Sequence, residues 1–314
     1  MIFEADVVNA FRYILGRDPE SREVVERFRE MRDPNAMRMA LVHSPESCRR
    51  NNMPLAGRHV GGPPMSVEFD VEMAVTQKIL DETRQTWVGL GHEDPYWSVL
   101  SSDEYRSDNL SSKTIENFYG SGRRTIEVVE RYFARAGLGT TELQTVLDYG
   151  CGLGRLTLAA AQVFPRVIGV DISRPHLDAA KARAERVGIG NVEFTLLESL
   201  GSFRDLPPVD LFFSFIALQH SPPPVIMASL EALLAKVNRG GYALFQVPTY
   251  RAGYSYRVGD DNAQEGRFEM HVVPQGDIFR LADRHDFRLL EVQEDGMAGV
   301  WEFMSNTFFM QKRS

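Results

Sequence analysis

The stretch Thr145-Val-Leu-Asp-Tyr-Gly-Cys-Gly-Leu-Gly-Arg-Leu-Thr157 decides the fold that this sequence predicts. Val146 and Leu147 are typical of the end of a buried strand, and an apolar helical run begins at Leu156 and ends near Phe164. Between them, glycines occupy positions 150, 152 and 154, where the lack of a Cβ lets the backbone turn tightly and approach a ligand. Strand, glycine turn and helix in this order predict a cofactor cradle.

A second strand-like run, Val167–Ile172, places Asp171 about 20 residues after the first glycine, where dinucleotide folds use a carboxylate to bind ribose hydroxyls. The glycine spacing differs from the G-x-G-x-x-G of those folds, which counts against the alternative of a nicotinamide-dependent oxidoreductase. Asp148 also precedes the first glycine. A carboxylate there repels a pyrophosphate but accepts hydrogen bonds from an ammonium group.

The pattern Asp148-x-Gly150-x-Gly152-x-Gly154, followed by Asp171, resembles motif I of the class I S-adenosylmethionine-dependent methyltransferases, usually written D-x-G-x-G-x-G. The resemblance covers roughly residues 145–312 and implies S-adenosylmethionine as the cofactor. The implied activity is in-line transfer of the sulfonium methyl group to a nucleophile. An ordinary strand, turn and helix without ligand is the alternative.

Strand and helix patterns alternate from residue 145 onward, which predicts an α/β fold with a doubly wound, mainly parallel sheet. We expect strands near 145–150, 167–172, 192–197, 209–216 and 241–247, and helices near 155–164, 174–187 and 223–237. Two further strand-like runs, Phe287–Glu294 and Glu302–Gln311, resemble the strand pair that closes the seven-stranded sheet of the class I methyltransferases.

Four segments divide the chain: a small helical module (1–50), a Pro- and Gly-rich linker (51–66), a mostly helical lead-in that covers the active site (67–140), and the cofactor-binding domain (141–314). In the module, Phe11–Pro19 and Leu41–Ser47 resemble a helical unit that recurs in bacterial proteins linked to glycan assembly. A helical extension that serves packing or homo-oligomerisation is the alternative.

In the lead-in we expect helices over Val71–Gly89 and Thr125–Ala136, with an aromatic, polar segment between them. Within that segment, Asp94–Ser101 and Phe118–Gly122 resemble the lead-in of bacterial methyltransferases, which closes over the cofactor. The resemblance implies that Tyr119 and Ser121 touch the methionine end of the cofactor or the substrate. Packing of these aromatic side chains against the sheet is the alternative.

Cofactor contacts are implied at the carboxyl ends of the strands, where such sheets bind ligands. Asp148 lies near the ammonium group, Asp171 accepts from the ribose, and Ile172 packs on the adenine. Glu198 stands where the family usually places a carboxylate for the adenine amino group. The full predicted set is Asp148, Gly150, Cys151, Gly152, Gly154, Arg155, Asp171, Ile172, Glu198, Ser199, Phe215, Gln219, Tyr119 and Ser121.

Two histidines are candidate bases for a hydroxyl acceptor, since imidazole titrates near neutrality. His220 lies in Leu218-Gln-His220, a phrase common in this superfamily, and His271 ends the polar insert after the fifth strand. A structural role in the loop is the alternative for His220. We expect no metal, because the fourth strand end offers no carboxylates.

Composition limits the function. The 314-residue chain has a formal net charge of −8, which argues against broad nucleic-acid binding. No apolar run approaches the ~20 residues of a membrane span, the first residues lack a signal-peptide pattern, and Cys48 and Cys151 form no disulfide framework. We therefore expect a cytoplasmic protein.

The acceptor that these patterns favour is a hydroxyl of a sugar, a glycolipid or another polar small molecule. This preference rests on the two histidines and on the glycan-linked resemblance of the first 50 residues. A fold does not fix the acceptor, so two alternatives stay open. One is a methyltransferase that acts on a protein or amine, and the other is a scaffold protein that binds the cofactor without turnover.

Overall fold

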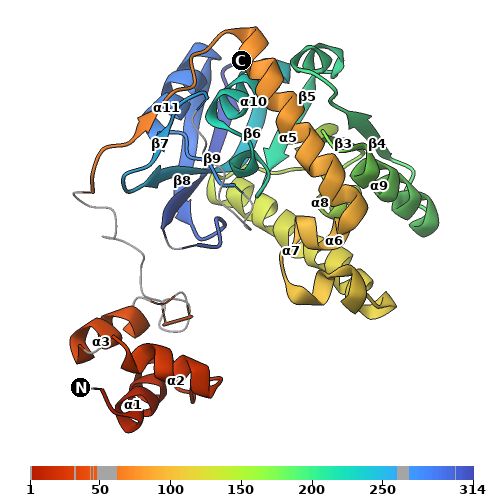
Figure 1. The fold of residues 1–314 in the computed structure, drawn as a ribbon. Coiled ribbons are helices and arrows are strands. Elements are labelled where there is room, and N and C mark those ends of the chain that lie inside the picture. The colour runs from red at the N-terminus through yellow and green to blue at the C-terminus, as the bar shows by residue number, and fades with distance from the viewer. Residues whose placement is uncertain are drawn as a thin grey trace. The chain divides into compact units, whose positions relative to one another are not determined.

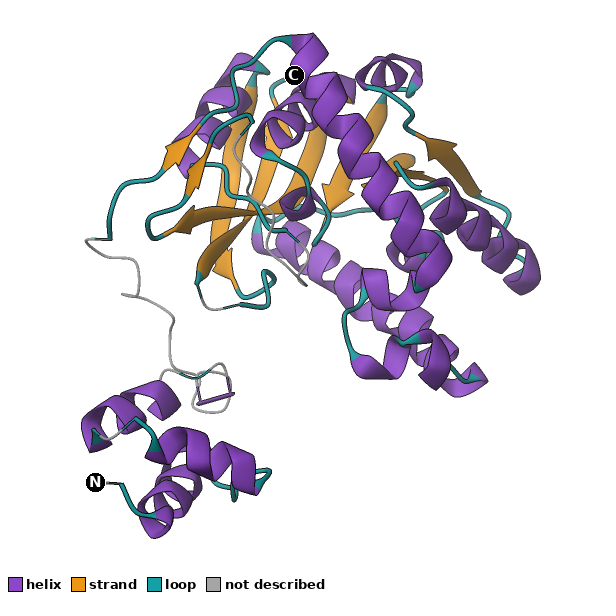
Figure 2. Ribbon diagram, in the orientation of Figure 1, coloured by secondary structure: helices purple, strands orange, loops and turns teal. Residues whose placement is uncertain are grey.

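The computed structural model describes residues 2–31, 33–42, 44, 46–47, 62–259, 269–300 and 302–314. Cys48 and residues 51–61 of the predicted linker lie outside the described residues. The chain divides into two compact units, Met1–Gly62 and Pro63–Ser314, which are described separately (Figures 1 and 2). None of the helices in the described ranges is long and apolar enough to cross a membrane.

Among its described residues, the first unit, which was predicted to be a helical module, contains the helices α1 (Glu4–Leu15), α2 (Arg22–Arg29) and α3 (Pro34–Val42). One small core holds them together, with Phe11 against Phe28 at a ring-centroid distance of 5.3 Å. Helix α2 begins where it does because the Ser21 side chain accepts a hydrogen bond from the Val24 amide.

The second unit is built on a seven-stranded sheet of order β4-β3-β2-β5-β6-β9-β8, in which only β9 runs antiparallel to its neighbours. The doubly wound fold class predicted from the sequence is therefore confirmed. The strands are β2 (Thr145–Tyr149), β3 (Arg166–Asp171), β4 (Val192–Leu196), β5 (Val209–Ser214), β6 (Val237–Arg251), β8 (Phe287–Asp295) and β9 (Phe303–Lys312).

Helices cover both faces of this sheet because neighbouring strand residues point to opposite faces (Figure 2). Leu147 belongs to the core beneath α10 (Pro223–Lys236) and α11 (Gln275–Arg284). Val146, one residue earlier, belongs to the core beneath α7 (Ser112–Arg135) and α8 (Arg155–Ala160). Helix α9 (Arg174–Val187) lies between β3 and β4 in the chain and contacts both.

The chain leaves β2 towards β3 and β4 on one side and returns to β5 and β6 on the other. The order thus reverses between β2 and β5, and a crevice forms outside the carboxyl ends of the strands at such a point. Short 3₁₀ turns after the strands include Leu200–Asp205 and Leu218–His220. The fold by itself places the candidate site at this edge.

The lead-in is more helical than predicted. It contains the two-residue strand β1 (Ser66–Val67), which pairs with β7 (Ser255–Tyr256), so Ser66 belongs to this unit rather than to a linker. Helices α5 (Met73–Glu93) and α6 (Pro95–Val99) follow, then the turns Asp103–Tyr105 and Ser107–Asn109.

Helix α7 begins at Ser112, thirteen residues before the helix that periodicity predicts at Thr125. The predicted helix was therefore too short, because α7 also includes the aromatic segment Phe118–Gly122. A capping box between Ser111 and Thr114 starts the helix early. Gly122 then stays inside it, because a Cβ there would lie 2.3 Å from the Arg155 carbonyl oxygen of α8. The glycine is needed for helix contact and does not mark a turn.

A matched pair of substitutions on α7 tests this contact. We expect Gly122→Ala to lower the free energy of unfolding by about 1–3 kcal/mol, since α8 must move to make room. Gly120→Ala should instead raise it by about 0.5–1 kcal/mol, because nothing lies within 4 Å of its Cβ and alanine favours a helix. Chemical denaturation of both variants measures the difference, and equal effects would contradict this account.

Candidate active site

The loop between β2 and α8 has the backbone of a ligand cradle. Gly150, Gly152 and Gly154 all have positive φ values, of 73°, 50° and 75°. A Cβ at position 150 would lie 2.2 Å from the Ala217 Cβ, and one at position 152 would lie 2.9 Å from a methyl group of Val99. Side chains are therefore excluded at these positions both by conformation and by space.

The Asp171 carboxylate at the end of β3 holds this loop in place. One oxygen accepts from the Gly152 backbone N–H at 2.7 Å, and the other accepts from the Ser173 N–H at 2.8 Å. A carboxylate oxygen has two lone-pair positions, so each keeps capacity for a further donor such as a ribose hydroxyl. The side chain predicted to bind the ribose thus also shapes the cradle.

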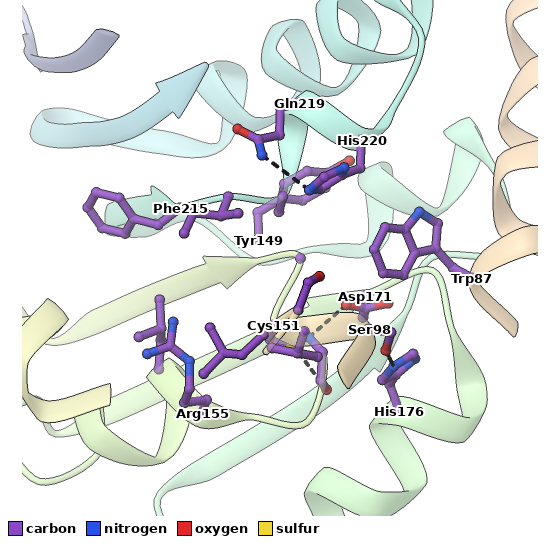
Figure 3. Close-up of a pocket in the computed structure, with 18 of the residues that line it drawn as sticks. Trp87, Ser98, Tyr149, Cys151, Arg155, Asp171, His176, Phe215, Gln219 and His220 are labelled. Atoms are coloured by element: carbon purple, nitrogen blue, oxygen red, sulfur yellow. Dashed lines mark hydrogen bonds between the residues drawn. The ribbon is translucent and has the colours of Figure 1, made fainter. Parts of the chain in front are cut away.

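A cavity of about 580 Å³ opens over the cradle, within the range of about 300–1,000 Å³ that is usual for cofactor sites (Figure 3). Glycines that exclude a Cβ, a carboxylate with free acceptor capacity and this volume together fit a bound nucleoside cofactor. The predicted residues that line the cavity are Asp148, Gly150, Cys151, Gly152, Arg155, Asp171, Ile172, Phe215, Gln219 and His220.

Much of the opposite wall comes from residues that the sequence did not single out for contact. Trp87 and the segment Trp97–Ser101 belong to the lead-in, which was predicted to cover the site. His176 comes from the first turn of α9, and Met297–Val300 from the turn between β8 and β9. That turn was visible as a short Gly/Met connection, whereas nothing in the sequence distinguished His176 from an ordinary helix residue.

Asp148 lies at the methionine end of the predicted cofactor position and is 1% exposed. Its carboxylate accepts a hydrogen bond from the Thr157 hydroxyl at 2.6 Å. Burial raises its pKa from the ordinary value of 3.8 to about 7, because a charged carboxylate is poorly solvated there. An ammonium group beside it would favour the charged form and lower that pKa again.

Arg155, which lines the same cavity, supplies the opposite charge. It is 9% exposed, and its guanidinium donates to the Ser121 hydroxyl at 3.2 Å, while its Nε has no hydrogen-bond partner among the described residues. Burial lowers its pKa, but arginine stays charged in proteins. A carboxylate and a guanidinium at one end of a cavity suit the zwitterionic amino-acid group of a methionine derivative.

Five predicted contact residues lie outside the lining of this cavity, and their roles stay predictions. Gly154 caps α8 at the back of the loop, against Ala180 and Phe194. Tyr119 and Ser121 lie on α7, where Tyr119 packs in an aromatic cluster with Tyr96 and Phe118 and Ser121 receives Arg155. Glu198 is exposed and pairs with Arg174 at 3.4 Å, and Ser199 caps the following 3₁₀ turn.

His220 lines the cavity beside Gln219 (Figure 3). Its Nδ1 lies 3.1 Å from the Glu269 carbonyl oxygen, which can only accept, so this nitrogen carries the proton. Its Nε2 therefore accepts, from the Gln219 amide nitrogen at 3.2 Å. Desolvation lowers the pKa of His220 to about 4, so the imidazole is neutral throughout the physiological range.

His271 does not line this cavity. It lies in a second, smaller cavity of about 310 Å³, where its Nδ1 is 2.9 Å from the Tyr254 hydroxyl. Met270, the residue before it, lines both cavities. The two histidines thus line different cavities, which share Met270 in their walls. In the described ranges no group of three or more metal-binding side chains could hold an ion, and the absence of a metal stays a prediction.

Comparison with known proteins agrees with this geometry. The family of methyltransferase domains matches residues 146–241. The chain is 36% identical over 131 residues to a trans-aconitate 2-methyltransferase of Deinococcus radiodurans, covering 40% of this chain and 46% of that enzyme. It is 26% identical over 176 residues to a tRNA (guanine-N(7)-)-methyltransferase of Shewanella halifaxensis, covering 52% of this chain and 73% of that enzyme. The chain spans only 17% and 15% of two further curated methyltransferases.

Among solved structures, magnesium protoporphyrin IX methyltransferase of Synechocystis PCC 6803 with bound S-adenosylmethionine matches with a TM-score of 0.51. The identity is 17%, over 74% of this chain and 97% of that one, so the likeness concerns the fold. The family match shows a methyltransferase domain at residues 146–241, and the strand order and this likeness show that the unit Pro63–Ser314 has the class I, Rossmann-like methyltransferase fold. Its cofactor is S-adenosylmethionine, as the sequence predicted.

The raised pKa of Asp148 leads to a pH dependence of cofactor binding. If Asp148 faces the ammonium group, the cofactor binds the charged carboxylate, whose population grows as pH rises through about 7. Between about pH 6 and 7.5 we expect affinity to rise by up to about tenfold, before the α-amino group itself loses its proton near pH 8. Titration calorimetry in two buffers measures the affinity and the released proton. Asp148→Asn should abolish this dependence, and an unchanged profile in that variant would contradict the assignment.

Substitution of Arg155 should weaken the binding of ligands that carry the amino-acid group more than the binding of ligands that lack it. Arg155→Met removes a charged hydrogen-bond donor for the carboxylate of the cofactor, which should weaken S-adenosylmethionine binding about 10- to 100-fold. Binding of 5′-methylthioadenosine, which lacks the amino-acid group, should change by less than about threefold. Equal losses for both ligands would show that the variant disturbs the cradle and does not remove a carboxylate contact.

Proposed function

We propose that this protein transfers the methyl group of S-adenosylmethionine to a hydroxyl group of a small polar acceptor, with a sugar or glycolipid as the first candidate. The observation that carries the proposal is the state of His220 in the cavity wall. Its Nδ1–H is fixed by the Glu269 carbonyl, so Nε2 is the accepting nitrogen. An acceptor hydroxyl that displaces the Gln219 amide from Nε2 would find a neutral hydrogen-bond acceptor for its proton.

The cofactor supplies a sulfonium carbon that is already electrophilic, so alignment and water exclusion are the main tasks of the protein. An O–CH₃ bond forms as the S–CH₃ bond breaks, and the hydroxyl proton must leave. His220 Nε2 takes this proton and passes it to solvent. Because the pKa of His220 is lowered to about 4, it orients the hydroxyl as a hydrogen-bond acceptor and is only weakly basic before transfer.

The second cavity supports a polar acceptor. It is lined by Arg251, Tyr254, Ser255, Glu269 and His271 among others, and Met270 joins its wall to that of the larger cavity. Donors and acceptors of both charges suit the hydroxyl groups of a sugar, and His271 in this arrangement binds the acceptor. The glycan-linked resemblance of the first 50 residues agrees with such a substrate. The net charge of −8 favours a small molecule over a nucleic acid.

The test is a survey of acceptors with S-adenosylmethionine labelled with ¹³C at the methyl group. Sugars, sugar nucleotides, glycolipids, amines and peptides are offered in turn, and the labelled product is characterised by NMR. An O-methyl ether on a hydroxyl compound supports the proposal. Transfer to amines or peptides alone overturns the oxygen acceptor, and cofactor binding without turnover on any acceptor favours the scaffold alternative.

A substitution of His220 gives the most specific test of the proton-accepting role. His220→Asn keeps a donor for the Glu269 carbonyl but loses the accepting nitrogen, so we expect kcat on the hydroxyl acceptor to fall about 10²- to 10⁴-fold. The Kd of S-adenosylmethionine should change by less than about threefold. In the wild type, activity should show no decrease attributable to His220 between about pH 8 and 5, because a histidine with pKa about 4 is protonated only below that range. A decrease in wild-type activity that is centred near pH 6.5 and disappears in the variant would contradict this assignment.

A further inference from the structure

His176 is buried in the wall of the cofactor cavity and is held from both sides. It is 1% exposed, and both of its ring nitrogens bond to serine hydroxyls. Nε2 lies 2.8 Å from the Ser98 Oγ of α6 (Figure 3). Nδ1 lies 2.7 Å from the Ser173 Oγ of the loop after β3. These two serines are 75 residues apart in the chain. The imidazole thus connects the lead-in directly to the loop that carries Asp171.

The connection continues to the cradle. The Ser173 hydroxyl also donates to the Trp87 carbonyl oxygen of α5 at 3.1 Å, and the Ser173 N–H donates to the Asp171 carboxylate at 2.8 Å. The other oxygen of that carboxylate accepts from Gly152. One chain of hydrogen bonds therefore runs from the cover formed by α5 and α6, through His176 and Asp171, to the glycine loop.

Helix α5 approaches His176 closely because it has a glycine at the contact. A Cβ at Gly91 would lie 2.8 Å from the His176 Nδ1 and 3.0 Å from the Ser173 Oγ. On the same helix, two residues earlier, Gly89 has nothing within 4 Å of its Cβ position. The packing of α5 against the imidazole thus depends on one missing side chain, and the chain provides a matched position that lacks this constraint.

We infer that His176 is a positioning residue that latches the α5–α6 cover over the cofactor, so that S-adenosylmethionine enters and leaves only when the Ser98–His176 contact opens. The inference rests on the methyltransferase function proposed above. Trp87, Trp97 and Ser98, which the latch holds in place, all line the cavity. A cofactor enclosed in this way is shielded from water while its sulfonium carbon reacts.

Proton counting shows why such a latch can open. The Ser98 hydroxyl lies 2.8 Å from the Pro95 carbonyl oxygen, and the Ser173 hydroxyl lies 3.1 Å from the Trp87 carbonyl oxygen. Each serine hydroxyl has one proton to donate. If Ser98 and Ser173 both donate to these carbonyl oxygens, both ring nitrogens of His176 must donate to the serines, which requires a charged imidazolium. Burial lowers the pKa of His176, against the raising effect of Asp171. A neutral ring leaves one of the four contacts unmade, and the closed state is correspondingly easier to open.

The experiment measures the rates of cofactor binding and release by stopped-flow tryptophan fluorescence, since Trp87 and Trp97 both face the cavity. The variants are Gly91→Ala, which pushes α5 away from the imidazole, and Gly89→Ala as its matched control. Because the latch must open both for entry and for release of the cofactor, a weaker latch should change both rates. Gly91→Ala should raise both the association and the dissociation rate by about tenfold, the effect of losing about one hydrogen bond. Gly89→Ala should change each by less than about twofold.

Two further variants keep the test independent of folding defects in Gly91→Ala. His176→Asn retains a polar group towards Ser173 but loses the bond to Ser98, and Ser98→Ala removes the same bond from the other side. Both should reproduce the faster entry and exit in folded protein, as checked by thermal unfolding. A rise in the dissociation rate alone would show a direct cofactor contact and overturn the latch, as would rates equal to those of Gly89→Ala. No cofactor binding by the wild type would instead refute the proposed function itself.

Discussion

The carboxylate of Asp171 accepts one backbone N–H from the glycine loop after β2 and one from Ser173, two residues after the end of β3. The cavity depends on this arrangement, because the left-handed glycines at positions 150, 152 and 154 have no side chains with which to fix their own conformation. A charged acceptor at the end of the neighbouring strand supplies the missing constraint. The same oxygens keep capacity for ribose hydroxyls, so the loop is shaped by the group that is also predicted to bind the ligand.

A second buried network holds the acceptor side of the cavity. The Gln246 amide on β6 donates to the Gln219 carbonyl oxygen at 3.0 Å and to the Ser305 hydroxyl of β9 at 2.6 Å. Gln219 in turn donates to His220. Buried polar groups need such partners, since an unpaired one costs a large share of the stability of a domain. A network of side-chain hydrogen bonds thus links β9 through Gln246 and Gln219 to the imidazole of His220, whose other nitrogen bonds to the Glu269 carbonyl.

Sequence reasoning worked best where the relevant pattern is local. The cradle, its two acids and the order of strands follow from glycine positions and from apolar runs that each occupy a few neighbouring residues. It underestimated the length of α7, which includes Phe118–Gly122 and contacts α8 at Gly122 through a long-range approach of two helices. For Glu198, the sequence places a carboxylate after β4, but only the structure shows it turned towards Arg174 in solvent.

By itself, the sequence determined the fold class, the cofactor and the loop predicted to bind it, because a strand, a glycine turn and a helix are specified by adjacent residues. The tertiary structure decided which side chains meet across that loop. His176 became part of the cavity through Ser98 and Ser173, and the two candidate histidines were separated into different cavities by the segment around Met270. Such contacts join residues far apart in the chain, and their geometry depends on the packing of whole helices and strands, which no local pattern encodes.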